Sequence, residues 1–332
     1  MRPAISIVMP TYNAEDVLER TLQSIEAQSI AGEIEVIVVD GGSTDRTLEI
    51  ARTFGATVLS NPRRLPEYGK QIGMQSAQGK YLVRQDADER YVSSGQLERR
   101  LEFLQHNPSV RCMVCDRMLP SEAPRGLSVS YACAFGDPFT YFVYRSKGSA
   151  LQTFKHNIAD RNLLKFAPGD ILPIGDGGTT LFDLDWIKRQ FPDHWGDLQT
   201  ACSLFSVCCE ATHCCGCIEK DDVVHDMNCT FQRYLSKLRF RVVNNLFDPM
   251  GSGYSARIQG EASGKLRRRK LLFIGYVASV IGPIWSSVYL AARFRDARML
   301  LHFFYTYFVV FNILILGTEK LLGIRKSNQS YG

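Results

Sequence analysis

The sequence predicts an α/β domain with a mainly parallel sheet flanked by helices, followed by a C-terminal helical hairpin in a membrane. Three observations lead to this fold class. Strand-like apolar runs alternate with helix-like segments over roughly the first 90 residues. Two long uncharged runs lie near the C-terminus. The charge is also divided: residues 1–232 carry 23 Lys+Arg against 30 Asp+Glu, whereas residues 233–332 carry 16 against 4.

The strands and helices of the first part follow one another at short intervals. Residues 5–9 form an apolar run closed by Pro10, and residues 34–39 are apolar on both faces, as is typical of a central parallel strand. Residues 15–28 repeat apolar side chains at helical spacing. Shorter strands are predicted at 57–59 and 80–83. One helix is predicted to begin after Ser43 or Thr44, either of which can cap it, and another helix is predicted over 67–78. This alternation implies right-handed βαβ units.

Polar residues collect where the predicted parallel strands end, which is where ligands bind in such sheets. They are residues 10–13 after the first strand, 40–43 after the second and 86–88 after the fourth. Asp86 and Asp88 are two residues apart, so in an extended chain both carboxylates would point to one side. Two carboxylates in that arrangement can share a divalent cation that holds a diphosphate.

Four ordered motifs carry a specific resemblance. Residues 5–13 (ISIVMPTYN), 36–47 (VIVVDGGSTDRT), 69–79 (GKQIGMQSAQG) and 81–88 (YLVRQDAD) together resemble glycosyltransferase family 2, which has the GT-A nucleotide-diphospho-sugar transferase fold. The resemblance covers about the first 90 residues closely and continues more loosely to about residue 245.

The resemblance implies a nucleotide-sugar site and a metal site. The metal, Mg²⁺ or Mn²⁺, would be held by the Asp86 and Asp88 carboxylates, and His225 matches a family position close to metal or diphosphate. Lys70 would neutralise phosphate charge. Asp45 would shape its loop, with helix capping as the alternative. The nucleotide-sugar-binding residues implied are Pro10, Thr11, Tyr12, Asn13, Glu15, Asp40, Ser43, Lys70 and Asp86.

A catalytic base is expected after the acceptor-side segment, which the resemblance places at residues 173–183. Inverting transfer is a direct displacement in which a base takes the acceptor proton. Asp197 is the choice for this base and Asp193 the second candidate, while an N-cap role for Asp197 is the structural alternative. A phosphate acceptor would need no base, because it is already ionised.

The C-terminal runs at 271–292 and 299–318 are each long enough to cross a bilayer core of roughly 30 Å. The first contains Gly282 and Pro283 and could kink or re-enter, and two buried core helices are the alternative. Basic flanks on both sides place the termini in the cytoplasm by the positive-inside rule. The arginines of the connector suit a hairpin in one leaflet, or helices lying flat at lipid phosphates.

The expected domain organisation follows from these boundaries. Residues 1–245 form the catalytic domain, 246–270 a basic juxtamembrane linker, 271–318 two transmembrane or re-entrant helices, and 319–332 a cytoplasmic tail. No apolar stretch of signal length precedes the first strand. We therefore expect a protein of the inner or plasma membrane whose catalytic domain faces the cytoplasm, with reduced cysteines. The six cysteines of 202–217 lack paired C-x-x-C spacing and are expected to be buried small hydrophobes.

The function predicted is that of a metal-dependent, inverting hexosyltransferase in polysaccharide or glycoconjugate synthesis. The donor would be a nucleotide sugar, most often UDP-linked in the resembled family, and the acceptor a membrane or lipid-linked glycan. The alternatives are a polyprenyl-phosphate sugar synthase and a catalytically inactive membrane scaffold with the nucleotide fold. Expected partners are the nucleotide sugar, the acceptor and membrane lipids. The basic, aromatic stretch 231–241 has no accompanying nucleic-acid motif, so no nucleic acid is expected.

Overall fold

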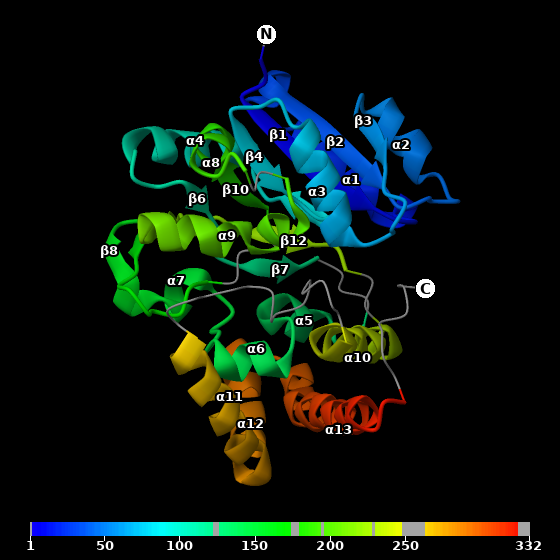
Figure 1. Cartoon of the computed structure of the whole chain (residues 1–332), viewed down its shortest axis with the longest axis vertical. Coiled ribbons are helices and arrows are strands. Elements are labelled where there is room, and N and C mark those ends of the chain that lie inside the picture. The colour runs from blue at the N-terminus through cyan, green and yellow to red at the C-terminus, as the bar shows by residue number, and fades with distance from the viewer. Residues whose placement is uncertain are drawn as a thin grey trace.

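The computed structural model describes residues 2–121, 126–173, 179–193, 196–227, 230–247 and 263–324. Its larger, N-terminal part, which contains the predicted catalytic domain, is built on a nine-stranded sheet with the strand order β3-β2-β1-β4-β10-β6-β11-β9-β8 (Figure 1). Strands β1 to β4 are mutually parallel, and antiparallel β10 begins the mixed half of the sheet. The bounds are β1 Ile5–Thr11, β2 Ile34–Asp40, β3 Thr57–Ser60, β4 Tyr81–Arg84, β6 Cys112–Met113, β8 Ile158–Asp160, β9 Leu163–Lys165, β10 Thr180–Asp183 and β11 Cys214–Gly216.

Helices cover both faces of this sheet, and the alternation of β1 explains why. Ile5, Ile7 and Met9 are fully buried in one core cluster, while Val8 points into the other. Helices α1 and α4 pack on the first cluster and helices α3, α8 and α9 on the second. The predicted parallel α/β arrangement is confirmed. The helices are α1 Glu15–Glu26, α2 Thr47–Thr53, α3 Pro66–Ser76, α4 Gln96–His106, α8 Leu184–Gln190 and α9 Leu198–Thr212.

A small second sheet lies beneath the first and carries a histidine of the site. It has the order β5-β12-β7, with β5 Glu89–Tyr91, β12 Val223–His225 and β7 Met118–Pro120. The antiparallel register of β12 on β5 places His225 opposite Glu89. Three segments far apart in the chain therefore meet directly below the turn that follows β4.

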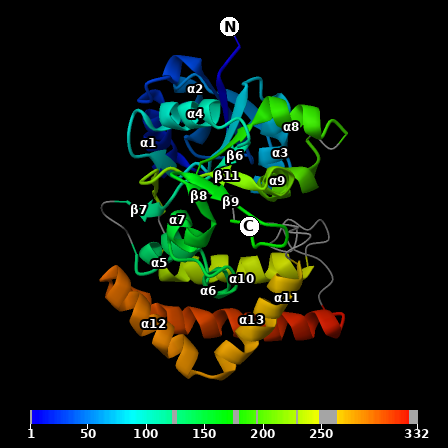
Figure 2. The same ribbon diagram turned by 90° about the vertical axis from the view of Figure 1, so that its left-hand side faces the viewer.

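A third layer of helices closes the molecule on the side away from the large sheet (Figures 1 and 2). The aromatic rings of Tyr131, Tyr234 and Tyr305 meet in its core, with a centroid distance of 4.8 Å between the last two. This contact joins the catalytic part to the C-terminal helices. The layer comprises α5 Val129–Phe135, α6 Pro138–Val143, α7 Ala150–Thr153, α10 Phe231–Phe247, α11 Ser263–Ala278, α12 Ile281–Phe294 and α13 His302–Leu321.

The first C-terminal apolar run is two helices rather than one straight helix. Helices α11 and α12 meet at 93° and form a V whose tip points away from the catalytic part (Figure 2). Val280 at the tip has a φ of +57°, and Pro283 lacks the N–H needed to continue the hydrogen bonds of α11. The kink expected in this run is confirmed.

By length and composition, one helical segment of the described chain could cross a membrane, and two could if the bent pair is counted as one span. The single segment is Ala297–Leu321. Its α13 part packs along α10 and lies across the axis of the V (Figures 1 and 2).

The cysteines predicted to be buried are buried. Cys202, Cys208, Cys209, Cys214, Cys215 and Cys217 all lie in the interior. Cys112 approaches one of them, with 3.6 Å between its Sγ and that of Cys209. Cys208, Cys209, Cys215 and Cys217 belong to the packed face between the sheet and α9, whereas Cys214 lies in the core on the other face, as small hydrophobic side chains would.

Candidate active site

The first two strand-end loops are joined by the carboxylate of Asp40. The parallel register pairs Thr11 with Asp40, and the Thr11 hydroxyl donates to Asp40 Oδ1 at 3.0 Å. The backbone N–H groups of Gly42 and Ser43 donate to Oδ2, each at 2.8 Å, and the Ser43 hydroxyl donates to Oδ1 at 2.5 Å. Asp40 is 5% exposed, so its charge is compensated within the loop and fixes the loop's shape.

A second set of hydrogen bonds holds the loop after β1 against the loop after β2. Asn13, with a φ of +47°, donates its backbone N–H to Ser43 Oγ at 2.8 Å and accepts from the backbone N–H of Thr44 at 2.9 Å. Glu15 Oε2 accepts from the backbone N–H of Arg46 at 3.0 Å. The structure thus brings together the residues predicted at these two loops.

Asp45 holds the start of α2, whose N-cap position is Arg46 and carries no side-chain cap bond. The Asp45 carboxylate accepts from the backbone N–H of Thr47 at 3.0 Å and from its hydroxyl at 2.5 Å. Burial by itself would raise the pKa of Asp45, but the hydrogen bonds from Thr47 and from the Glu15 backbone outweigh it and lower this pKa. The expected capping by Ser43 or Thr44 is wrong, because α2 begins at Thr47 and its N-cap position is Arg46. Asp45 supports the first turn from just outside the helix.

An aromatic ring is presented at the mouth of these loops. Tyr12 is 41% exposed, and the Arg64 guanidinium carbon lies 5.5 Å from its ring centroid. Pro10, two residues earlier in the chain, packs under α3, where a Cβ on Gly69 would lie 3.0 Å from the Pro10 Cβ. An exposed ring on a rigid loop is suited to stacking against a planar ligand.

Lys70 reaches the third strand-end loop from α3. Its Nζ lies 2.9 Å from Asp86 Oδ1, with the lysine side chain 12% exposed and the Asp86 side chain 41% exposed. The close packing of α3 on β1 makes this possible, because Gly73 leaves no room for even a methyl group beside Val8. The two residues predicted to face phosphate and metal are therefore adjacent.

Asp86 and Asp88 point to different partners. The chain turns directly after β4, where the backbone N–H of Glu89 donates to the Asp86 carbonyl at 3.1 Å. Asp86 consequently meets Lys70, while Asp88 Oδ2 lies 3.0 Å from His225 Nε2. The expectation that an extended chain would point both carboxylates to one side is wrong, because this segment is a turn.

His225 and Asp88 form an ion pair. Burial by itself would lower the pKa of His225, but the Asp88 carboxylate outweighs it and raises this pKa well above its usual value. Burial would likewise raise the pKa of Asp88, and the charge and hydrogen bond of His225 instead hold it well below its usual range. Within the described ranges no three His, Cys, Asp or Glu side chains are grouped so as to hold a metal ion.

The chain on either side of His225 is anchored by three further ion pairs. Asp221 pairs with the fully buried Arg100 at 2.6 Å, and Asp226 pairs with Arg90 at 2.7 Å. Asp222 accepts two bonds from the Arg117 guanidinium, of 2.9 and 2.5 Å. These pairs fix β12 and with it the height of the histidine below the Asp86–Asp88 turn.

The sequence analysis did not identify Glu89 and Arg84 as site residues. Both line a cavity that also contains Lys70, Asp86 and His225. Glu89 is 1% exposed, and its Oε2 accepts from the backbone N–H groups of Asp86 at 3.1 Å and Thr179 at 3.2 Å. Arg84 is buried at the end of β4 and donates to the Ala201 carbonyl of α9. The available signals were an arginine ending an apolar strand and an acid directly after the D-x-D motif.

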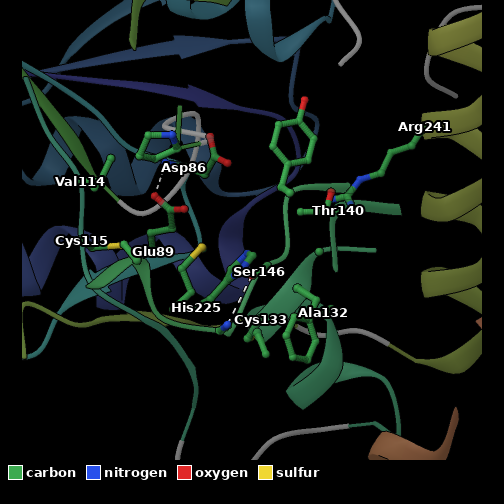
Figure 3. Close-up of a pocket in the computed structure, with 18 of the residues that line it drawn as sticks. Asp86, Glu89, Val114, Cys115, Ala132, Cys133, Thr140, Ser146, His225 and Arg241 are labelled. Atoms are coloured by element: carbon green, nitrogen blue, oxygen red, sulfur yellow. Dashed lines mark hydrogen bonds between the residues drawn. The ribbon is translucent and has the colours of Figure 1, made fainter. Parts of the chain in front are cut away.

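A cavity of about 530 Å³ lies beside these residues. Asp86, Glu89 and His225 lie along one side of it, and α10 supplies Arg241 from the opposite side (Figure 3). Lys237 of α10 also lines it. The stretch 231–241 is part of this helix and faces the cavity with basic side chains. The sheet side of the cavity thus carries Asp86 and Glu89 together with Lys70 and Arg84. The helix side carries Lys237 and Arg241, and Arg241 is paired with Asp137 at 3.0 Å.

Asp193 and Asp197 are not among the described residues that line this cavity. Asp197 is half-buried just before α9, and its carbonyl accepts from the Ala201 backbone N–H at 2.9 Å. The neighbouring Gly196 carbonyl is held on α3 by the side-chain amides of Gln71 at 2.6 Å and Gln75 at 2.9 Å. Ala201, one turn further along α9, does line the cavity. The assignment of the base to Asp197 stays a prediction.

Positions 174–178 of the acceptor-side segment lie outside the described residues.

Comparison with known proteins places this site in a family. Residues 6–164 match the model of glycosyl transferase family 2. An uncharacterized glycosyltransferase of Haemophilus influenzae is 34% identical over 115 residues, which are 32% of this chain and 44% of the relative. A PGL/p-HBAD biosynthesis glycosyltransferase of Mycobacterium bovis is 35% identical over 114 residues, with the same two shares. The chain thus spans less than half the length of these curated relatives.

Among solved structures, the mannosyltransferase PcManGT from Pyrobaculum calidifontis, in complex with GDP-Man and Mn²⁺, is similar over 98% of this chain and 89% of its own. The TM-score is 0.50 and the identity 15%, so the likeness concerns the fold. Residues 6–164, just under half of the chain, are thus similar to glycosyl transferase family 2, and the chain has the GT-A fold.

Proposed function

We propose that this protein is an inverting glycosyltransferase that moves a sugar from a nucleotide-sugar donor, UDP-linked, to an acceptor at a membrane surface. One observation carries the proposal. The loops at the carboxyl ends of β1, β2 and β4 share one edge of the parallel strands. At this edge the Lys70–Asp86 pair lines a cavity whose far wall carries Lys237 and Arg241. The match of residues 6–164 to the model of glycosyl transferase family 2 supports it.

The residues of the loops fit the parts of a nucleotide sugar. Tyr12 offers an exposed ring to the base, and Asn13 and Asp40 hold the loop that would surround the ribose. Lys70 lies where its ammonium would neutralise a diphosphate oxygen, and Lys237 and Arg241 would add positive charge from α10. The sugar would then lie in the cavity beside Glu89.

A divalent cation fits the chemistry of the donor set. Asp86 and Asp88 carry carboxylate oxygens and His225 an imidazole, which are ligand types that Mg²⁺ or Mn²⁺ accepts. To hold one ion together, Asp86 would have to leave Lys70, and the Asp88–His225 ion pair would have to open with loss of the histidine proton. When bound, such an ion neutralises charge on the departing diphosphate. The Mn²⁺ in the complex of the Pyrobaculum mannosyltransferase supports this part of the proposal.

The experiment is a donor screen that detects released nucleotide diphosphate, with Mn²⁺ or Mg²⁺ and a membrane lipid extract as acceptor. Asp86→Asn should abolish turnover while the thermal unfolding of the protein is retained. Asp16→Asn, at an exposed position of α1, is the matched control and should behave as the unsubstituted protein. Absence of turnover with every nucleotide sugar would favour the inactive scaffold, and near-normal turnover of Asp86→Asn would remove the metal assignment.

We also propose that the V of α11 and α12 attaches the protein to a single membrane leaflet, with the catalytic domain in the cytoplasm. The apolar parts of its arms, residues 271–278 and 281–292, are about 12 and 18 Å long at 1.5 Å per residue. Half of a hydrocarbon core is about 15 Å, so each arm matches one leaflet. Ile281 and Trp285 near the tip are 76% and 71% exposed.

The charges at the two ends of the V support the same arrangement. Cations precede the apolar part of α11 and follow that of α12, so both ends suit lipid phosphates. Helix α13 would lie along the surface, because one side of it packs on α10 while Phe311 and Leu314 on another are more than 60% exposed. The cations are Lys265, Arg267, Arg268, Arg269, Lys270, Arg293, Arg295 and Arg298.

Depth-dependent quenching tests this attachment. With Trp186 and Trp195 replaced by Phe, Trp285 is the remaining tryptophan, and brominated lipids should quench it most strongly when bromine lies deep in the bound leaflet. A Val280→Cys label reached by an impermeant maleimide from the opposite side of sealed vesicles would show a span and contradict the proposal.

A further inference from the structure

A second cavity lies between the catalytic part and the V. It has a volume of about 720 Å³, and α12 contributes Tyr289 and Arg293 to its wall. Its lining is cationic, with Lys147, Lys155, Arg161 and Arg293 against the two acids Asp116 and Glu219. Such a surplus of positive charge in a concave site favours an anionic ligand.

Asp116, which lines both cavities, already accepts hydrogen bonds from its own surroundings. Its carboxylate therefore repels a bound anion less than a free carboxylate would. Asp116 Oδ1 accepts from the Ser149 hydroxyl at 2.5 Å and from the backbone N–H of Leu151 at 3.1 Å. The carboxylate therefore acts as a brace for the loop that carries Lys147, and part of its charge is neutralised within that loop.

Arg293 fastens α12 to the same loop. Its guanidinium donates to the Lys147 carbonyl at 3.2 Å, to the side chain of Gln152, and to the Tyr289 hydroxyl at 3.3 Å. Gly148 allows the close approach, because a Cβ there would lie 3.0 Å from the Phe294 ring. The cationic cavity is thus held at the end of α12 that is remote from the exposed tip.

The two cavities meet at Asp116 and Ser149, which line both. A ligand could therefore extend from the second cavity toward Asp86 and Lys70 without leaving the protein surface. From the tip of α12 to Arg293 the helix rises about 18 Å, close to the thickness of one leaflet. A phosphate on a lipid whose tail lies beside α12 would reach the level of this cavity.

We propose that the second cavity binds the phosphate groups of a lipid-linked sugar acceptor, whose sugar hydroxyl enters the first cavity. This rests on the proposed function and names its acceptor class. A lipid monophosphate that attacks the donor itself would need its phosphate beside Asp86. The cations of the second cavity lie on the side of Asp116 away from Asp86. They suit a phosphate or diphosphate that anchors the acceptor, while a hydroxyl of the attached sugar reaches the first cavity and reacts. Arginine and lysine are the side chains that recognise such groups.

The test measures binding of farnesyl diphosphate to the full chain in detergent with EDTA, which removes metal-dependent binding. The double charge reversal Lys155→Glu, Arg161→Glu should weaken this binding at least tenfold. Both side chains are exposed, so folding should be retained. Arg52→Glu, an exposed reversal on α2, is the matched control and should bind as the unsubstituted protein.

Further arms separate the sources of phosphate. Inorganic pyrophosphate should compete with farnesyl diphosphate for binding to the unsubstituted protein. In sugar transfer to the lipid extract, the double variant should have a raised KM for the acceptor and an unchanged KM for the donor. Unaltered farnesyl diphosphate binding by the double variant would overturn the proposal. The proposal would also be overturned if the double variant bound farnesyl diphosphate normally and lost only its binding to vesicles of phosphatidylcholine with phosphatidylglycerol. That result would mark a surface for lipid headgroups in general.

The donor screen keeps this inference separate from the proposed function. If the unsubstituted protein releases no nucleotide diphosphate but its farnesyl diphosphate binding depends on Lys155 and Arg161, the transferase proposal fails and the phosphate site stands. If donor turnover occurs and the charge reversals leave lipid diphosphate binding intact, the phosphate site fails and the transferase proposal stands.

Discussion

The substitution Gly73→Ala tests the idea that close packing of α3 on β1 positions Lys70. An alanine Cβ at this position would lie 2.2 Å from Val8 Cγ1, 3.0 Å from Val8 Cγ2 and 3.2 Å from Val39 Cγ2. Ordinary contacts between carbon atoms are about 3.5–4.0 Å. Val8 and Val39 are fully buried on adjacent central strands, so the helix rather than the strands has to move.

Two opposing effects determine the stability of this variant. Replacing glycine by alanine in a helix favours folding by about 1 kcal/mol. Overpacking a close-packed core costs about 1–3 kcal/mol. Because the contact is with two rigid valines, we expect the clash to prevail and the free energy of unfolding to fall by about 1–2 kcal/mol. Lys70 lies one turn earlier on the same helix, so the donor KM should rise several-fold.

The assay is chemical unfolding in detergent together with donor turnover. Gly317→Ala is the matched control, because a Cβ at this helical glycine of α13 meets nothing within 4 Å, and it should not destabilise the protein. Val8→Ala is the partner for a double-mutant cycle and should recover at least about 1 kcal/mol of the loss in combination with Gly73→Ala. A Gly73→Ala protein with unchanged stability and donor KM would refute the reasoning.

Three further outcomes are expected. Arg100→Met should lower the free energy of unfolding by about 3–5 kcal/mol, because it leaves the buried Asp221 carboxylate without its cation; a urea-unfolding loss below about 1 kcal/mol would contradict this. Hydrogen bonds lower the pKa of Asp45 in the folded protein, so the Asp45 carboxylate contributes to the free energy of unfolding above the ordinary carboxyl pKa of about 4, and this contribution is lost as pH falls. Asp45→Ala should remove this contribution. The free energies of unfolding at pH 7 and pH 3 should therefore differ less in the variant than in the unsubstituted protein. Asp197→Asn should lower kcat at least about 100-fold if a hydroxyl acceptor is activated there; undiminished transfer would rule Asp197 out as the base.

The sequence predicted the first half of the chain well because its signals are local. Residues 5–9 and 34–39 are apolar runs of strand length, and their parallel pairing follows from the helix between them. Once the strands are parallel, their carboxyl ends share one edge, so the loops containing Asn13 and Asp40 had to meet.

The sequence could not predict where individual carboxylates would point. Asp86 and Asp88 are separated by one residue, yet a backbone hydrogen bond across the turn directs one toward α3 and the other toward β12. The second of these contacts joins residues 137 positions apart. The glycines at 69, 73 and 79 were part of a recognisable motif, but their need for close backbone approach became apparent from the packing of α3 and β1.

The C-terminal end shows the same division. Composition alone determined that this part is apolar with basic flanks, since those properties are sums over neighbouring residues. The break at Val280 lies close to Pro283, which is a local signal. The packing of α13 on α10 and the cationic cavity beside Arg293 were decided by tertiary structure. They depend on contacts between segments more than 60 residues apart, which no local pattern encodes. The sequence by itself therefore determined the family, the parallel sheet and the candidate donor residues, while the tertiary structure decided which charges face one another and where an acceptor could lie.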